Sequence, residues 1–341
     1  MAGPAIRSWE MARLLSARGH EVRLAAAGAG EVDPPGFEVV ALAGQSLRTH
    51  TGWADVLVVQ GLVTANHPAL VGTGKRMVVD LYDPYVLETL EMYSERDLDY
   101  QLSQYWPSLS ALLVQLRVGD FFLCANDRQR DFWMGMLVAA NRVNPHTLRQ
   151  DHLLRSLIDV APFGTPSEPP RHSGKPAAKG AISGIAPDDR LAIWAGGIYN
   201  WFDPLSLIRA WPRVLESVSE ARLLFLGVRH PNPVVPEMAM TRDAIRLAEE
   251  LGLRGRSVFF NQGWVPYERR ADFLLESDVG VSMHLEHLET RVSFRTRFLD
   301  YIWAALPVVA TEGDAFAEWA ERSGAGTVVG YEDVDAIAAQ M

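Results

Sequence analysis

Residues 286–311 read EHLETRVSFRTRFLDYIWAALPVVAT, and the order of patterns in this stretch decides the fold class. An apolar run at 279–283 precedes it, a polar loop is expected at 289–293, and helical spacing extends over 294–304. The stretch ends in the β-branched run 308–310. Strand, helix and strand in this order predict a βαβ unit with two parallel strands.

The same alternation runs through the chain in two series. The first predicts strands at 21–27, 56–60, 77–81, 121–125 and 158–161, with helices at 6–17, 84–93, 108–116 and 127–140. The second predicts strands at 191–195, 222–226, 257–260, 279–283 and 308–310, with helices at 204–217, 237–251, 267–276, 294–304 and 315–322. We therefore expect an α/β protein of two domains with parallel sheets, which face a crevice at the carboxyl ends of their strands.

A segment rich in Pro, Gly and Ser separates the two series and has too few large apolar residues to build a core. It predicts an N-terminal domain at 1–163, a linker or hinge region at 164–189 and a C-terminal domain at 190–341. A βαβ unit needs a strand before the helix at 6–17, and a last helix begins only at Asp333. The ends therefore indicate a fragment or misplaced start, with the first strand and the C-terminal helix apparently missing.

Composition and charge exclude several classes of function. A chain of 341 residues with a formal net charge of −10 is typical of a two-domain enzyme and unlike a nucleic-acid-binding protein. No apolar run reaches the roughly 20 residues that cross a bilayer, so membrane contact is expected to be peripheral at most. The single cysteine, Cys124, cannot form an internal disulfide and lies in an apolar strand. It favours a cytoplasmic location and an inert packing role.

The second domain opens with an apolar run that ends in Gly196 and Gly197, where the lack of a side chain lets the backbone approach a ligand. Tyr199 and Trp201 follow, and they can flank a bound sugar or base or fill the space between the domains. Asp203 precedes a proline and is interpreted as the N-cap of the next helix.

Residues at the start of the helical pattern 294–304 are suited to binding a diphosphate, because hydroxyl groups and a cation surround a helix start there. They are Ser293, Phe294, Arg295 and Thr296. Further along, Asp300 can accept hydrogen bonds from both hydroxyls of a ribose. The residue types alone equally allow an amphipathic helix with an ion pair between Arg297 and Asp300, or between Arg297 and an outside partner.

This segment resembles a known family. Asp300-Tyr-Ile-Trp-Ala-Ala-Leu-Pro-Val-Val is similar to the second-domain motif of retaining glycosyltransferases with the GT-B fold, in particular glycosyltransferase family 4, the glycosyl transferases group 1. The resemblance implies two Rossmann-like domains facing a central cleft. It also implies that Asp300 binds the ribose hydroxyls and that Glu289 lies beside the donor sugar.

Other landmarks occur in the family's order along nearly the whole chain. The run 259–269 resembles the strand and loop that hold the nucleotide base, which implies contacts from Trp264 and Val265. The run 224–229 resembles a strand whose loop faces the phosphates, which implies a phosphate contact from Arg229. Residues 160–165 resemble the interdomain hinge, and residues 1–7 resemble a glycine loop that contains Gly3.

The chain also departs from the family's pattern. Asp300 is one methylene shorter than the usual Glu, and Ala305 replaces the usual Gly. No Arg and Lys follow Gly197, so the charge of a diphosphate would have to be met by Arg229, Arg295 or Arg297. Tyr82-Asp83 stands where the family commonly has His-Asp, so no catalytic histidine is expected in the first domain.

We expect a hexosyltransferase-like enzyme that moves a sugar from a nucleoside diphosphate sugar to a hydroxyl of a glycan, lipid or small molecule. Retention of configuration is implied by the resemblance, and neither a cofactor nor a metal is expected. The predicted catalytic residues are Glu289, Arg229, Arg295 and Asp83. The predicted donor-binding residues are Gly3, Gly196, Gly197, Trp264, Val265, Ser293, Phe294, Thr296 and Asp300.

Two alternatives stay open: a sugar-nucleotide epimerase on the same fold, and a non-catalytic nucleotide-sugar-binding protein. Two other interpretations are set aside. The Gly72–Lys75 run lacks the spacing of a phosphate loop and precedes a strand, not a helix. His284, Glu286, His287 and Glu289 have a spacing that would suit a metal site on a helix, but here a strand end and a loop are expected.

Overall fold

The computed structural model describes residues 3–26, 36–42, 44–228, 236–263 and 265–341. The chain divides into two compact units, one formed by Met1–Val86 with Leu102–Pro162 and the other by Leu87–Gln101 with Phe163–Met341. The chain passes from one unit to the other within α4 (Tyr85–Met92), again within α5 (Leu98–Val118), and a third time after Pro162. Among the described residues, no helix is both long enough and apolar enough to span a membrane.

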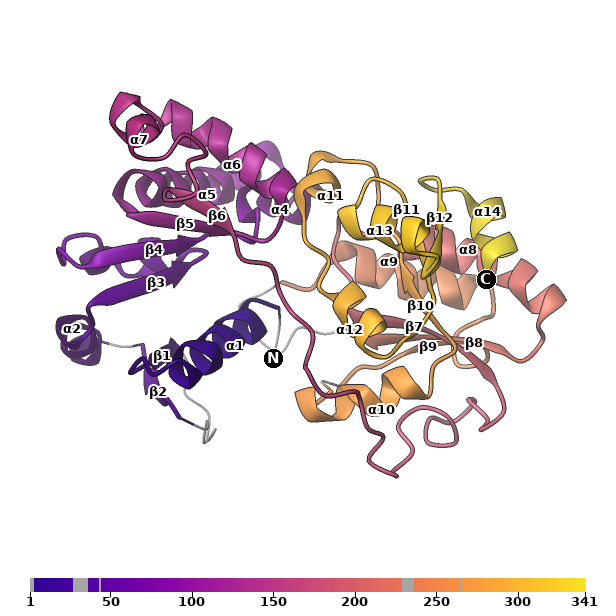
Figure 1. Cartoon of the computed structure of the whole chain (residues 1–341). Helices are drawn as coiled ribbons and strands as arrows, with labels where there is room; N and C mark the ends of the chain where they lie inside the picture. The colour runs from indigo at the N-terminus through magenta and orange to yellow at the C-terminus, as the bar shows by residue number, and fades with distance from the viewer. Residues whose placement is uncertain (1–2, 27–35, 43, 229–235, 264) are drawn as a thin grey trace. The chain divides into compact units, whose positions relative to one another are not determined.

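The first unit contains parallel strands in two sheets within its described part (Figure 1). In one, β1 (Arg23–Ala26) pairs with β2 (Glu38–Ala41); in the other, the order is β3 (Val56–Gln60), β4 (Arg76–Asp80), β5 (Phe121–Cys124) and β6 (Ile158–Val160). The remaining elements are α1 (Gly3–Ala17), α2 (Gly44–Trp53), α3 (Val63–Asn66), η1 (Pro68–Leu70), α6 (Asp127–Ala139) and α7 (Pro145–Gln150).

The core of the first unit lies between the four-stranded sheet and two helices. Val79 and Phe122 of the sheet pack with Leu116 of α5 and Trp133 of α6, and all four side chains are almost fully buried. Cys124 belongs to the same core, and burial raises the pKa of its thiol to about 12. Its predicted role as inert packing agrees with this position.

The second unit is built on a six-stranded parallel sheet in the order β12-β11-β10-β7-β8-β9. Its strands are β7 (Arg190–Gly197), β8 (Ala221–Gly227), β9 (Val258–Phe260), β10 (Val279–Ser282), β11 (Val308–Thr311) and β12 (Gly326–Val329). Its helices are α8 (Pro204–Ser217), α9 (Ala239–Glu250), η2 (Tyr267–Arg269), α10 (Arg270–Leu275), α11 (Leu288–Val292), α12 (Arg297–Trp303), α13 (Ala315–Ser323) and α14 (Val334–Gln340).

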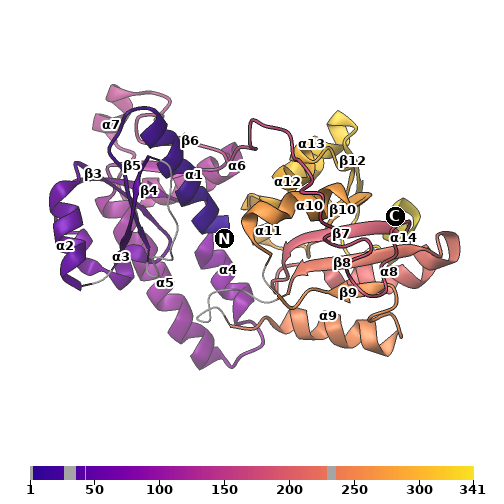
Figure 2. The same ribbon diagram turned by 90° about the horizontal axis from the view of Figure 1, so that it is seen from below.

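Alternate residues of the central strand β7 enter two different cores, as expected for a strand buried on both faces. Ala192 and Trp194 pack in the core formed with α8, α9 and α14. Leu191, Ile193 and Ala195 pack in the core formed with α10, α12 and α13 (Figures 1 and 2). The second unit is therefore a three-layer, doubly wound domain, and the predicted α/β class is confirmed.

All ten predicted strands are present, with ends within two residues of the prediction. The missed strands β2 and β12 have four residues each and lie at sheet edges, where a short run shows little pattern. The helix predicted from residue 108 begins at Leu98 and continues through Pro107. The loop predicted at 289–293 is wrong: α11 occupies most of it, and its five residues are too few for helical spacing to show.

The segment 164–189 is predicted from the sequence to be a linker or hinge, but part of it packs into the core of the second unit. Ala178 and Ile185 are buried in that core. Glu276, at the end of α10, accepts hydrogen bonds from the backbone N–H groups of Ala177, Ala178 and Lys179 at 2.6–2.8 Å. Hydrogen bonds to a carboxylate thus hold the fastened segment 164–189 in place, although it has few large apolar side chains of its own.

These hydrogen bonds also set the ionisation of Glu276. Desolvation raises its pKa, but the bonds from His172 and from the three backbone N–H groups outweigh this and leave the pKa below its ordinary value. A carboxyl with a lowered pKa stabilises the fold above the pKa of the unfolded chain, about 4.3 for Glu. That stability is lost as the pH falls through the folded-state pKa.

Glu276→Ala should lower the free energy of unfolding by about 2 kcal/mol at neutral pH, because three N–H groups lose their acceptor. Chemical denaturation measures the loss, and amide exchange should accelerate at residues 177–179. Glu250→Ala is the matched control, because Glu250 is an exposed residue of α9 with a weak ion pair. Equal losses in the two variants would contradict the assigned role of Glu276.

Candidate functional site

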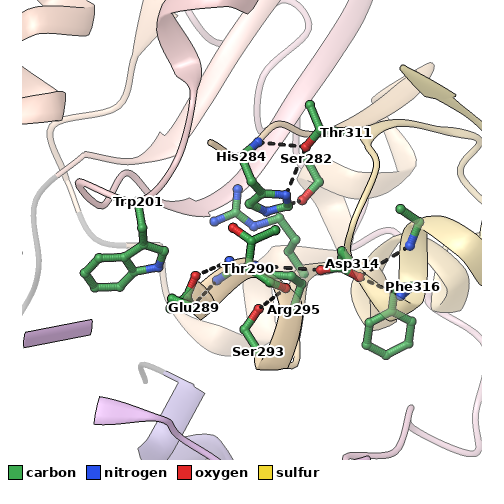
Figure 3. A network of polar contacts seen from close by, with 12 residues as sticks. Trp201, Ser282, His284, Glu289, Thr290, Ser293, Arg295, Thr311, Asp314 and Phe316 are labelled. Atoms are coloured by element: carbon green, nitrogen blue, oxygen red, sulfur yellow. Dashed lines mark hydrogen bonds and ion pairs between the residues drawn. The ribbon is translucent and has the colours of Figure 1, made fainter. Parts of the chain in front are cut away.

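Polar side chains of the second unit gather where β7, β10 and β11 end (Figure 3). Gly197 is the last residue of β7, His284 lies just beyond β10, and Asp314 lies just beyond β11. The strands are parallel and adjacent in the sheet, so their carboxyl ends share one edge. In open α/β sheets this edge is where ligands bind.

A buried ion pair joins two of the predicted catalytic residues. Arg295 donates from Nη1 to Glu289 Oε1 at 2.7 Å and from Nη2 to Glu289 Oε2 at 2.5 Å. The side chains are only 6% and 1% exposed, so water does not screen the pair. Arg295 is therefore committed to a carboxylate and is not available as an unpaired cation.

A second buried arginine, Arg297, has no such carboxylate among the described residues. Its guanidinium lies against the rings of Trp194 and Phe202, with its carbon 4.6 and 4.3 Å from their centroids. Nη2 donates to the carbonyl oxygen of Gly197 at 3.2 Å, whereas Nη1 is buried and forms no hydrogen bond with the residues that the structure describes. Burial, together with the charge of Arg295, lowers the pKa of Arg297 to about 10.

Asp314 caps α13 and lies on the other side of Arg295 from Glu289 (Figure 3). Its Oδ1 accepts the N–H groups of Phe316 and Ala317. Its Oδ2 lies 3.7 Å from Arg295 Nε and has no hydrogen bond within the described part of the chain. Burial raises the pKa of Asp314 to about 6 even though Arg295 lowers it. The Asp314 carboxyl therefore gains or loses its proton close to neutral pH.

His284 is completely buried beside the two arginines. Its ring nitrogens lie 3.3 Å from Ser282 Oγ and 3.2 Å from Thr311 Oγ1. Burial and the charges of Arg295 and Arg297 lower its pKa well below the ordinary value, so the ring is neutral. No group of three or more potential metal-binding side chains occurs within the described ranges.

An aromatic loop closes this cluster from the side of β7. Tyr199 stacks on Trp201 with centroids 4.8 Å apart, and a Cβ added to Gly197 would lie 2.9 Å from the Tyr199 ring. His287 binds the loop through the carbonyl oxygen of Trp201 at 3.1 Å. Asp203 accepts the N–H of Ser206, which confirms its predicted capping role.

The structure places the other predicted donor-binding residues of the second unit as follows. Val265 packs at the edge of the core with α12, Ser293 is buried after α11, and Thr296 precedes α12 without capping it. Phe294 stacks on Phe163 at 5.6 Å. Gly196 has φ +132°, a value that favours glycine. Arg229 and Trp264 lie outside the described residues.

Asp300 forms a different ion pair from the one considered in the sequence. Its Oδ1 accepts from Arg270 Nε of α10 at 3.1 Å, and Arg297, three residues earlier, points elsewhere. The predicted ion pair between Arg297 and Asp300 is therefore wrong, because the Arg297 guanidinium lies against the rings of Trp194 and Phe202 whereas Asp300 pairs with Arg270. No local pattern identified Arg270, which is 30 residues away from Asp300.

The first unit has its own polar cluster at the carboxyl ends of β3 and β4. Arg7 of α1 forms a buried ion pair with Asp80 at 2.5 and 2.9 Å, and Gln60 donates to Asp80 at 3.2 Å. Gly3 begins α1, and Asp83 lies between β4 and α4. Burial raises the pKa of Tyr85, and the charge of Asp83 raises it further.

A comparison with protein families matches a part of the second unit. Residues 189–341 match the family model described as Glycosyl transferases group 1. Residues 189–341 form a glycosyl transferases group 1 domain. No curated protein matches the chain.

Solved glycosyltransferases share the fold of the chain that carries this group 1 domain. It is similar to WaaG, a glycosyltransferase involved in lipopolysaccharide biosynthesis, with TM-score 0.68 and 18% identity over 98% of this chain and 85% of that chain. Sucrose-phosphate synthase from Thermosynechococcus elongatus is similar with TM-score 0.62 and 14% identity, over 99% of this chain and 83% of that chain. Anabaena HepE in complex with UDP and glucose is similar with TM-score 0.61 and 13% identity, over 99% of this chain and 85% of that chain. The fold is thus GT-B.

Asp314→Asn should make the group 1 domain less sensitive to pH. A raised pKa means that the acid favours the fold at low pH, and that this contribution is lost as pH rises through about 6. Asn retains an Oδ1 to cap α13 but does not titrate. The free energy of unfolding of the variant, relative to the native chain, should therefore be higher at about pH 7 than at about pH 4. A difference that does not change with pH would contradict this.

Proposed function

We propose that this chain transfers a sugar from a nucleoside diphosphate sugar to the hydroxyl of an acceptor. The family match covers only the C-terminal domain, so the activity of the whole chain is inferred. Anabaena HepE, which has a similar fold, was crystallised with UDP and with UDP-glucose. These ligands support a nucleoside diphosphate sugar as the donor of this chain.

The observation that carries the proposal is Arg297, a buried cation at a ligand-binding edge that forms no ion pair with a carboxylate of the described residues. Burying a charge costs several kcal/mol unless an opposite charge compensates it. A diphosphate near Gly196 and Gly197 would supply that charge. Arg297 would then perform the task that Arg and Lys after the first strand have in the resembling family.

The chemistry follows from where charge develops. As the bond between the anomeric carbon and the diphosphate breaks, negative charge accumulates on the leaving oxygen. A cation already held in place by Trp194, Phe202 and Gly197 stabilises that charge without reorganising. We assign this role to Arg297, with the Arg295–Glu289 pair next to it and Glu289 beside the sugar.

The finer points of the proposal rest on the family resemblance. They are retention at the anomeric carbon, arginine in place of a metal ion at the diphosphate, and a ribose contact from Asp300. The acceptor, a glycan, lipid or small molecule, is assigned to residues of the first unit that include Gly3 and Asp83. No cofactor is needed, because the donor carries its own leaving group.

A donor panel separates this function from its two alternatives. The chain is incubated with nucleoside diphosphate sugars, with and without candidate acceptors, and both nucleoside diphosphate and sugar products are measured. Transfer requires the acceptor, epimerisation proceeds without it, and a binding protein produces neither change. Epimerisation without an acceptor would overturn the proposal, as would binding of donors without turnover across an acceptor library.

Arg297→Met should lower kcat/KM about a hundredfold, because it removes one preorganised charge while keeping most of the packing between the two rings. Arg297→Lys retains the charge and should recover part of the rate. Circular dichroism and thermal unfolding show whether each variant folds. If folded Arg297→Met keeps the native kcat/KM, Arg297 does not stabilise the leaving group.

A further inference from the structure

Arg270 fixes the orientation of Asp300. Its Nε donates to Asp300 Oδ1 at 3.1 Å, and its Nη1 donates to the carbonyl oxygen of Tyr267 at 3.0 Å. The Asp300 side chain is 34% exposed, so its carboxylate still reaches solvent. None of the described residues hydrogen-bonds to Oδ2, which is therefore the oxygen open to a ligand.

Two aromatic rings hold the Arg270 guanidinium in place. Its central carbon lies 3.6 Å from the centroid of Tyr267 and 4.6 Å from that of Trp303. Trp303 in turn donates from Nε1 to the carbonyl oxygen of Glu168 at 2.7 Å. A chain of contacts thus extends from the fastened segment 164–189 through Trp303 and Arg270 to Asp300. Each contact restricts the next, and the carboxylate at the end has little freedom to rotate.

This restriction compensates for the shortened side chain at position 300. A carboxylate on a longer Glu could reach a ribose by adjusting its extra torsion, whereas Asp must be held at the right place. Desolvation raises the pKa of Asp300, and the charge and hydrogen bond of Arg270 oppose this. Arg270 therefore favours the charged form, which is the stronger hydrogen-bond acceptor.

We propose that Arg270 is a positioning residue that makes Asp300 select a ribonucleotide over a deoxyribonucleotide. This inference rests on the proposed function, since it assumes that a nucleoside diphosphate binds in the C-terminal domain. Arg270 acts through Asp300 Oδ1, and Oδ2 accepts the ribose hydroxyl. A donor without that hydroxyl leaves a desolvated carboxylate oxygen without a partner and is rejected.

The test compares dissociation constants for ribose and 2′-deoxyribose or 3′-deoxyribose forms of UDP, GDP and ADP by calorimetry. The native chain should bind at least one ribose form about tenfold or more tightly than one of its deoxy counterparts. Asp300→Asn should remove most of this preference. Arg270→Gln should reduce it to about twofold or less, mainly by weakening binding of the ribose form, and Arg270→Lys should restore part of it.

Arg269→Gln is the matched control. Arg269 is the neighbouring cation and pairs with Asp272 at 2.7 Å, not with Asp300. Its loss should leave the preference for ribose at the native value. Thermal unfolding of all variants identifies those that fold, and Arg270→Lys decides the matter if Arg270→Gln does not fold.

The possible failures are distinguishable. If the native chain binds none of the nucleoside diphosphates, the proposed function fails and this inference fails with it. If the native chain binds and prefers ribose but folded Arg270 variants keep the full preference, the positioning role alone is overturned. Equal weakening of ribose and deoxyribose forms in Arg270→Gln would likewise overturn it, because that is the effect of a purely structural residue.

Discussion

The charge of two buried arginines is the constraint around which the C-terminal domain is organised. Glu289 balances Arg295 directly, whereas Arg297 relies on two aromatic faces and one carbonyl oxygen. Aromatic rings attract a cation through their negative faces, but less strongly than a carboxylate does. A third cation in the aromatic loop after Gly197 would repel the two that are already buried.

Tyr301 fixes α12, the helix that carries Arg297 and Asp300, against the sheet. Its hydroxyl accepts the N–H of Ala195 at 3.0 Å and lies within hydrogen-bond distance of carbonyl oxygens of β7 and β10. A Cβ on Gly280 would lie 2.7 Å from its ring, so glycine is required for α12 to approach the sheet. Arg297, four residues earlier, shares the inner face of the helix, and Asp300 is turned toward α10.

The sequence predicted the strands well because parallel strands buried on both faces read as short continuous apolar runs. Glu289, Arg295 and Asp300, which the sequence predicted for the site, each form an ion pair in the C-terminal domain, and a helix-start signal at Asp314 could have added that residue. The sequence did not predict the pairing of Arg7 with Asp80 or of Arg270 with Asp300. Arg7–Asp80 and Arg270–Asp300 join residues 73 and 30 positions apart, and no local periodicity encodes such distances. The helix α11 was missed because its five residues are too few to show the helical repeat of apolar positions.

The fastened segment 164–189 shows how a stretch poor in apolar residues acquires a fixed place. Its backbone N–H groups donate to the carboxylates of Asp272 and Glu276, and the carbonyl oxygen of its Glu168 accepts from Trp303. A Pro-rich and Gly-rich composition indicates only that such a segment has no regular structure of its own. Order is supplied by the acids and the indole that surround it, which are distant in sequence and therefore invisible to a local interpretation.

The burial of Cys124 has a practical consequence for spectroscopy. Its thiol is fully buried in the first unit's core, and burial raises its pKa to about 12, so very little reactive thiolate is present near neutral pH. As the chain has no other cysteine, one introduced at a chosen surface position would carry a fluorophore or spin label almost exclusively. The native thiol would meanwhile react only when the first unit opens, and its slow modification by a maleimide would time that opening.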